Sequence, residues 1–209
     1  MTREITAILL AAGESLRMGQ PKMLLPWGET TVLGQVVNIF SAGLSQRTNR
    51  QMDPDNEILV VTGGARSLLE AEVARLADRY PLRIVYNPNY ALGGMLSSIQ
   101  AGLLALELGT RATLIGLGDQ PQVREETVRH ICTAYLQTES PILIPSFQNR
   151  RGHPWLAART LWPEILALPQ STSPRRFLDT HTGQIEYVAA DESILQDLDT
   201  PEDYNRQRP

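Results

Sequence analysis

The chain has 209 residues, of which 42% are hydrophobic and 20% are charged, and its formal net charge is −4. This length suits one α/β domain that can bury a full core, so we expect a single domain over residues 1–209. The negative charge argues against general binding to nucleic acid, and no apolar run approaches the length of a membrane span. No basic region precedes a long apolar core near the N-terminus, so we expect no signal peptide, and the single cysteine suits a reducing cytoplasm.

Apolar runs and helical patterns alternate along the chain. Short apolar runs predict strands at Ile5–Leu10, Glu57–Val61, Leu82–Tyr86, Ala112–Leu117, Pro141–Pro145 and Gln184–Val188. Apolar residues at helical spacing predict helices at Thr30–Leu44, Ala65–Tyr80, Gly94–Leu108, Pro121–Leu136, Thr160–Leu168 and Pro174–Thr180. Such alternation favours a single-domain, three-layer αβα fold, with helices on both faces of a mostly parallel sheet. Ligands of such sheets bind beyond the carboxyl ends of the strands.

The first strand opens into a glycine-containing loop that carries Arg17 and Lys22. Glycine lets the backbone approach an anion and turn its N–H groups inward, and the two basic side chains suit phosphate oxygens. The loop is not a P-loop, because five residues separate Gly13 from Gly19 and Gln20 follows, and the chain lacks a G-x-G-x-x-G fingerprint. We interpret it as a phosphate cradle, and a plain basic surface loop is the alternative.

Polar residues follow the third and fourth strands. After the third strand, Gly94, Ser97 and Ser98 offer backbone N–H groups and hydroxyls at a helix start, which suit a nucleotide. An ordinary helix cap is the alternative. After the fourth strand, Asp119 stands in Gly-Asp-Gln-Pro, where a carboxylate either holds Mg²⁺ against phosphates or caps the next helix.

Two motifs occur near the end of the chain. Arg151 and His153 belong to an Arg-Gly-His-Pro segment that could bind a phosphate, although a histidine before proline is often only a loop hydrogen-bonder. Asp199 precedes Thr-Pro-Glu-Asp, a string typical of a helix start, so a C-terminal cap with a solvated acidic end is one explanation of this acidic run. Cys132 lies in a helical stripe and is predicted to be a core residue.

The string A-A-G-x-S-x-R-M-G-x-x-K-x-L-L around Gly13 closely resembles the signature of the MobA-like nucleotidyltransferases. Within that group it is most similar to the molybdenum cofactor cytidylyltransferases. The resemblance covers almost the whole chain, from Ile8 to Asp203, through N-P-x-x-x-x-G, G-D-Q-P, R-G-H-P and D-x-D-T-P-E-D segments. It implies a Rossmann-like α/β fold of the nucleotide-diphospho-sugar transferase type. It also implies Mg²⁺-dependent transfer of CMP from CTP to the molybdopterin cofactor, with release of pyrophosphate.

The resemblance also implies roles for individual residues. Arg17, Lys22 and Asp119 would be catalytic, and Asp119 and Asp199 would bind one Mg²⁺. Arg151 and His153 would bind the acceptor. The residues implied to bind the nucleotide are Leu10, Ala11, Ala12, Gly13, Arg17, Lys22, Gly94, Ser97, Ser98 and Asp119.

Other functions remain open at this point. The same chemistry could serve another acceptor, such as a sugar phosphate or phosphoenolpyruvate. A binding protein could instead carry the matured cofactor to a molybdenum hydroxylase apoenzyme without catalysis, although Lys22 and Asp119 argue against this. A nicotinamide dehydrogenase lacks support because the glycine fingerprint is missing. The expected partners are therefore CTP, the molybdenum cofactor and a hydroxylase apoenzyme, with no nucleic acid and no membrane.

Overall fold

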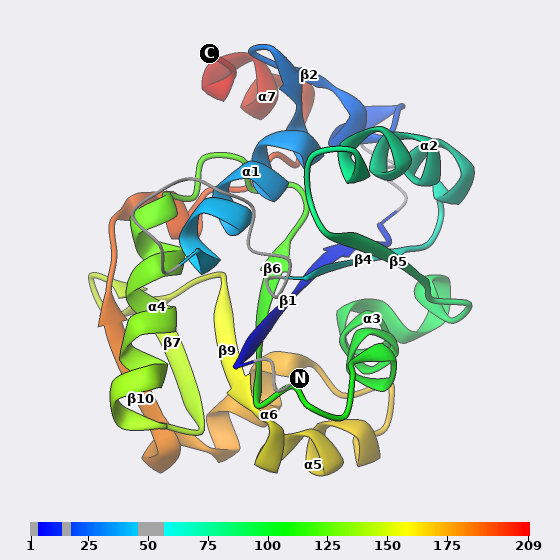
Figure 1. The fold of residues 1–209 in the computed structure, drawn as a ribbon. Coiled ribbons are helices and arrows are strands. Elements are labelled where there is room, and N and C mark those ends of the chain that lie inside the picture. Colours follow the sequence, from blue (N-terminus) through cyan, green and yellow to red (C-terminus); the bar gives the residue numbers. More distant parts are fainter. Residues whose placement is uncertain (1–3, 14–17, 46–56) are drawn as a thin grey trace.

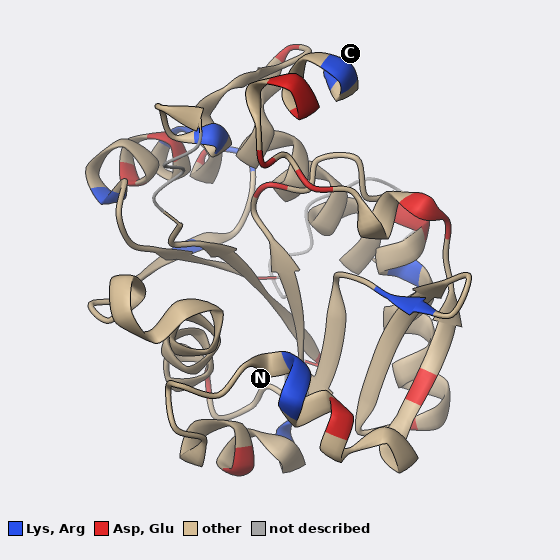
Figure 2. Cartoon of the chain, turned by 180° about the vertical axis from the view of Figure 1, so that it is seen from behind, with Lys and Arg blue, Asp and Glu red and all other residues tan. Residues whose placement is uncertain are grey.

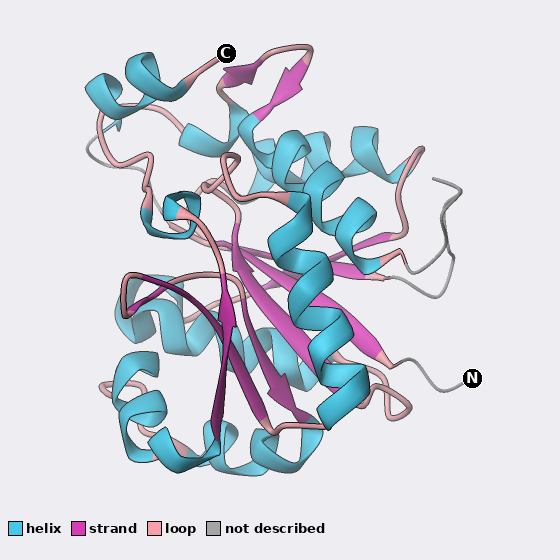
Figure 3. Ribbon diagram, turned by 90° about the vertical axis from the view of Figure 1, so that its left-hand side faces the viewer, coloured by secondary structure: helices cyan, strands magenta, loops and turns pink. Residues whose placement is uncertain are grey.

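The computed structural model describes residues 4–13, 18–45 and 57–209, and its centre is a sheet with helices on both faces (Figures 1 and 3). The strand order is β10-β7-β9-β6-β1-β4-β5, and β8 pairs with β7. The strands of this sheet are β1 (Ile5–Ala11), β4 (Ile58–Thr62), β5 (Leu82–Tyr86), β6 (Ala112–Leu117), β7 (Ile142–Phe147), β8 (Arg150–Arg151), β9 (Trp155–Ala158) and β10 (Ile185–Ala189).

Most neighbouring strands run parallel, so the predicted Rossmann-like α/β fold is confirmed. In the centre, β1 lies between β4 and β6, which places Leu10 beside Val61 and Leu117. Two strands are exceptions: β8 pairs antiparallel with β7, and β9 runs antiparallel between β6 and β7. The second of these, β9, is part of the central strand order. The sequence analysis missed this strand because its four residues are all buried and show no alternation, a pattern that periodicity alone does not assign to a strand.

Two apolar cores lie on opposite faces of the sheet. Along β1 the side chains alternate, so that Ala7 and Leu9 join one core and Ile8 joins the other. Helices α1, α2 and α4 cover the first face, and α3, α5 and α6 cover the second. The helices are α1 (Val32–Leu44), α2 (Arg66–Ala77), α3 (Tyr90–Ala105), α4 (Glu125–Thr138), α5 (Trp162–Ala167), α6 (Pro174–Thr180) and α7 (Pro201–Gln207). No helix of the described residues is both long and apolar enough to cross a membrane.

Cys132 is buried on α4, as predicted, with 3% of its surface exposed. Burial raises the pKa of its thiol to about 12, because a thiolate has no solvation there. This cysteine therefore contributes to packing and has no reactive thiolate near neutral pH.

One helix boundary differs from the prediction in a way that matters for the site. The helix predicted to begin at Pro121 begins at Glu125, because Arg124 has an extended backbone (φ −86°, ψ 144°). Residues between β6 and α4 therefore form a turn at the carboxyl end of the strand. Asp119 lies in this turn and does not cap α4.

The C-terminal helix α7 packs on a small hairpin formed by β2 (Pro26–Trp27) and β3 (Thr30–Thr31) (Figure 1). The rings of Trp27 and Tyr204 are 6.4 Å apart, and the Tyr204 hydroxyl donates to the carbonyl of Pro26 at 2.5 Å. A reciprocal capping box between Thr200 and Asp203 starts the helix, as the sequence predicts. This docking holds the segment before α7 beside the 3-10 helix η2 (Lys22–Leu24).

Candidate active site

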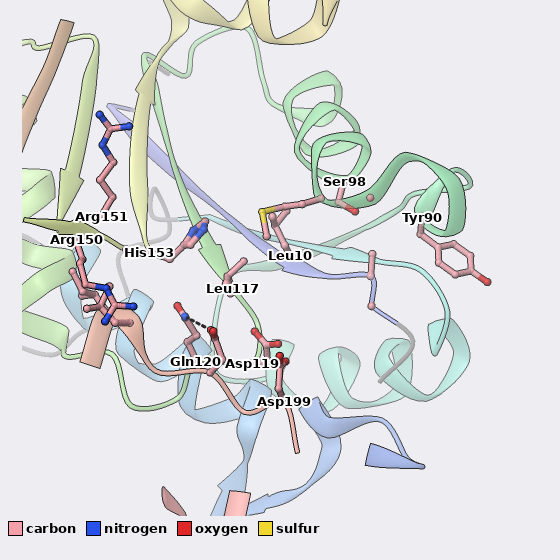
Figure 4. A pocket seen from close by; sticks show the side chains of 18 residues that line it. Leu10, Tyr90, Ser98, Leu117, Asp119, Gln120, Arg150, Arg151, His153 and Asp199 are labelled. Carbon is pink, nitrogen blue, oxygen red and sulfur yellow. Dashed lines mark hydrogen bonds between the residues drawn. The ribbon is translucent and has the colours of Figure 1, made fainter. Parts of the chain in front are cut away.

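A pocket of about 620 Å³ lies at the carboxyl ends of β1 and β6 (Figure 4). Its volume falls within the range of small-molecule binding sites, about 300–1,000 Å³. The structure brings together at this pocket most of the residues singled out in the sequence, from five separate segments of the chain: Leu10, Ala12, Gly13, Gly94, Ser98, Asp119, Arg151, His153 and Asp199.

Among the described residues, three of those assigned to the nucleotide do not line the pocket: Ala11, Lys22 and Ser97. Ala11 is 1% exposed and packs in the core, because the alternation of β1 turns it away from the side that Leu10 and Ala12 face. Ser97 is a residue of α3 and is 3% exposed. Arg17 lies outside the described residues.

A buried asparagine builds the wall of the pocket near α3. The Asn87 side-chain nitrogen donates to the hydroxyls of Ser97 at 2.8 Å and Ser98 at 3.0 Å. Its oxygen accepts from the backbone N–H of Asn89 at 2.9 Å. Ser97 therefore holds the wall in place, whereas Ser98 also faces the pocket.

Gly94 interrupts α3 at this wall. Its backbone (φ 55°, ψ −153°) lies in a region that residues with a side chain rarely adopt. The helix starts at Tyr90, four residues before the predicted position, and is kinked at Gly94. The bend leaves Gly94 and Tyr90 on the pocket wall.

Two carboxylates from distant parts of the chain meet at one ammonium group. The Lys22 ammonium contacts Asp119 Oδ2 and lies 3.1 Å from Asp199 Oδ1. Asp119 follows β6 and Asp199 precedes α7, and Figure 4 shows their side chains close together on one side of the pocket. We call Asp119 and Asp199 the acidic pair.

The environment keeps Lys22 protonated. Burial on its own lowers the pKa of the Lys22 ammonium, but the charge of Asp119 and hydrogen bonds to Asp119 and Asp199 outweigh it, so the pKa lies above its ordinary value. The acidic pair is thus arranged to hold a cation. Mg²⁺ prefers one or two protein carboxylates, with phosphates and water as its other ligands, so the acidic pair fits this ion. Among the described residues no three His, Cys, Asp or Glu side chains form a metal cluster, so substrate oxygens and water would complete its coordination.

The opposite wall of the pocket comes from β8 and the segment that follows it. The Arg151 guanidinium donates from Nη1 to Asp179 Oδ1 at 2.7 Å. It also donates to the Tyr187 hydroxyl from Nη2 at 2.7 Å and from Nε at 2.9 Å. Burial lowers the pKa of His153, against the opposing effects of Asp119 and Asp197, so its imidazole is neutral near pH 7. Arg151 and His153 were predicted to bind the acceptor substrate. Neither of them therefore presents an uncommitted positive charge to the pocket.

Gln120 ties this wall to the C-terminal segment. Its side-chain nitrogen donates to Gln196 O at 3.1 Å and to Asp197 Oδ1 at 2.9 Å. Both partners can only accept, so the orientation of the amide is fixed. The amide oxygen of Gln120 is buried and has no hydrogen-bond partner among the described residues. Gln120 thereby helps to hold the segment that carries Asp199 against the turn that carries Asp119.

The sequence analysis assigned no role to several other residues that line the pocket. Three of them are polar or charged and lie one or two positions from a residue with an assigned role: Arg150, Gln120 and Asp197. This proximity in the sequence was the only feature that could have marked them as site residues. Tyr90 lies within the N-P-x-x-x-x-G segment, and Ile194 and Leu195 carried no polar signal at all.

A family model described as the MobA-like NTP transferase domain matches residues 7–185 of the chain. The protein belongs to this family. Family membership makes it a nucleotidyltransferase, and the resemblance inferred from the sequence is confirmed.

Two relatives that are named for different nucleotides have the same sequence identity to this chain, 30%. The chain is 30% identical to the molybdenum cofactor cytidylyltransferase of Escherichia coli (strain K12) over 203 residues, which cover 96% of this chain and 93% of the relative. It is also 30% identical to the molybdenum cofactor guanylyltransferase of Mesorhizobium japonicum over 166 residues, which cover 78% and 69%.

The fold is similar to that of Rv0371c from Mycobacterium tuberculosis H37Rv, with a TM-score of 0.78, 27% identity and coverage of 99% of this chain and 97% of that chain. A complex of Rv0371c with manganese has a TM-score of 0.74 at 26% identity and covers 99% of this chain and 98% of that chain. This structural relative has therefore been solved in complex with manganese.

Proposed function

We propose that this enzyme transfers CMP from CTP to the molybdenum cofactor in a Mg²⁺-dependent reaction, releasing pyrophosphate and giving molybdopterin cytosine dinucleotide. The observation that carries the proposal is the meeting of Lys22 with the acidic pair, whose two carboxylates line the pocket at the carboxyl ends of β1 and β6. The relative from Escherichia coli, which matches nearly the whole chain, is named for this activity.

The reaction needs alignment and charge stabilisation more than acid–base catalysis. An oxygen of the acceptor's terminal phosphate attacks the α-phosphorus of CTP and forms a new P–O bond. The bond from the α-phosphorus to the oxygen that bridges to the β-phosphate breaks, and pyrophosphate leaves with the electron pair. A phosphate monoester with a second pKa of about 6 is already largely dianionic at neutral pH, so the protein need not supply a base. Catalysis then consists of positioning and electrostatic stabilisation.

The residues divide these tasks. Asp119 and Asp199 would hold Mg²⁺, which supplies positive charge to the phosphates when bound. Lys22 would neutralise charge on the triphosphate, and so would Arg17. The manganese complex of the structural relative supports a divalent cation in this fold. Asp119 and Lys22 therefore serve as catalytic residues, and the wall of Leu10, Ala12, Gly13, Gly94 and Ser98 receives the nucleotide.

The proposal predicts that the enzyme prefers CTP to GTP. Ala12 lines the pocket just after β1, and the relative from Escherichia coli that matches nearly the whole chain is named a cytidylyltransferase. We expect a pyrimidine to fit and a purine to clash, and each tenfold preference needs only about 1.4 kcal/mol. The measurement is the rate of pyrophosphate release with each nucleoside triphosphate, Mg²⁺ and molybdenum cofactor, with the product identified by mass.

Controls without cofactor and without Mg²⁺ separate transfer from simple hydrolysis. Faster turnover with GTP than with CTP would overturn the choice of base but leave the transfer intact. Pyrophosphate release that occurs only with a different phosphate acceptor would show that the molybdenum cofactor is not the acceptor substrate. Binding of the cofactor without pyrophosphate release from any nucleotide would show a carrier protein instead.

A further inference from the structure

The hairpin between β7 and β8 places two consecutive arginines at the pocket. Gln148 and Asn149 both have positive φ, 49° and 62°, which forms a tight turn between the strands. Arg150 pairs with Phe147, and Arg151 pairs with Ser146. Successive side chains of a strand point to opposite faces, so the two guanidinium groups have different surroundings.

Arg151 is committed to the protein. Its guanidinium makes an ion pair with Asp179 of α6 and two hydrogen bonds with the Tyr187 hydroxyl of β10. An incoming anion would have to compete with the carboxylate of Asp179 for the same charge. Arg151 therefore joins β8 to α6 and β10.

Arg150 is exposed, and among the described residues it has no carboxylate or hydrogen-bond partner. Figure 4 shows its guanidinium on the side of Gln120, whereas Arg151 extends in the opposite direction. In Figure 2 these two residues form the short blue strand β8 at the side of the sheet. Arg150 thus places an uncompensated positive charge at the pocket wall.

The rest of this wall repels an anion. Asp197 lines the pocket beside the acidic pair, and the charge of Arg151 on this wall is paired with Asp179. A dianionic phosphate that approaches the α-phosphorus from this side needs a cation to offset these carboxylates. A guanidinium offers two parallel N–H donors to a phosphate, which gives orientation as well as charge.

We propose that Arg150, rather than Arg151, binds the terminal phosphate of the acceptor and directs its oxygen toward the nucleotide. This assignment rests on the proposed function, because it takes the acceptor to be a phosphate monoester. It deepens that function by identifying the acceptor subsite, formed by Arg150, Gln120 and the segment of His153, across the pocket from Ser98.

The first test is the kinetics of Arg150→Gln. Loss of a charged hydrogen-bond donor is expected to raise the KM for the molybdenum cofactor by about tenfold to a hundredfold, with the KM for CTP changed by less than about threefold. Arg150→Lys should recover part of the loss, because a point charge replaces the fork. Arg176→Gln is the matched control, since it removes an exposed arginine of α6 that does not line the pocket.

The outcomes separate the two proposals. No transfer by the wild-type enzyme would overturn the proposed function. Transfer by the wild type with an unchanged cofactor KM in Arg150→Gln would overturn only the role of Arg150. A second measurement does not need turnover: inorganic phosphate, titrated calorimetrically into protein loaded with Mg²⁺ and a non-hydrolysable CTP analogue, should bind at least about tenfold more weakly to Arg150→Gln. Equal phosphate binding by both proteins would also overturn the assignment.

Arg151→Gln completes the test. Because Arg151 joins three elements, its loss is expected to lower the melting temperature. The melting temperature of Arg150→Gln should stay close to that of the wild type. A rise in cofactor KM in Arg151→Gln with an unchanged melting temperature, and none in Arg150→Gln, would reverse the roles and contradict the proposal.

Discussion

Asp119→Asn is expected to fold normally and to reduce the rate of nucleotidyl transfer by about a hundredfold or more. The substitution keeps the shape of the side chain and removes the charge that faces Lys22. One carboxylate of the acidic pair then no longer supports Mg²⁺ or orients the ammonium. The measurement is pyrophosphate release at saturating CTP, Mg²⁺ and molybdenum cofactor, together with the melting temperature.

Asp199→Asn should have a smaller effect in the same assay. The side chain of Asp199 is 42% exposed against 21% for Asp119, so water screens its charge more strongly. Asp78→Asn, an exposed position at the end of α2, is the matched control and should leave the rate unchanged. Asp119→Asn turnover within about threefold of the wild type would contradict the assigned role.

Lys22→Ala is expected to lose most nucleotidyl transfer, and its stability should become more dependent on Mg²⁺. Without the ammonium, Asp119 and Asp199 face each other uncompensated, and two nearby carboxylates repel. The metal-free variant should therefore be less stable than the wild type, and Mg²⁺ should raise its melting temperature more than that of the wild type. Thermal unfolding with and without Mg²⁺ measures this difference, and pyrophosphate release measures the activity.

Composition gives an independent reason to expect that arginine cannot replace this lysine. The chain has 19 lysines and arginines in total, and Lys22 is the only lysine; all the others are arginines. A compact ammonium fits between two carboxylates and can move to a phosphate, whereas a planar guanidinium occupies more space. Lys22→Arg should thus recover the melting temperature more than the activity. Full activity in Lys22→Arg, or near-normal turnover in Lys22→Ala at saturating CTP, would show that the ammonium has no special role.

The sequence predicted the central fold well because local patterns determine it. The apolar run of β1 and the helical stripe of α1 can be recognised without knowledge of the partners on which they pack. The turn after each parallel strand falls at the same edge, so Gly13, Ser98 and Asp119 were expected near one another. The pocket that they line in the structure agrees with that expectation.

Features that depend on long-range packing were not predictable in the same way. The antiparallel strand β9 is defined by its neighbours β6 and β7, which lie on either side of it. The choice between Arg150 and Arg151 depends on the register of a two-residue strand and on Asp179 and Tyr187, far away in the chain. The position of Asp199 beside Lys22 depends on the docking of α7 on the β2–β3 hairpin.

The most direct test of the proposed site is a crystal structure with Mn²⁺ and a non-hydrolysable CTP analogue, in which anomalous scattering locates the metal. We expect one manganese ion in contact with Asp119, Asp199 and phosphate oxygens, with the Lys22 ammonium on the triphosphate. A metal and nucleotide bound away from the acidic pair, or a bound metal that Asp119 does not contact, would contradict the account.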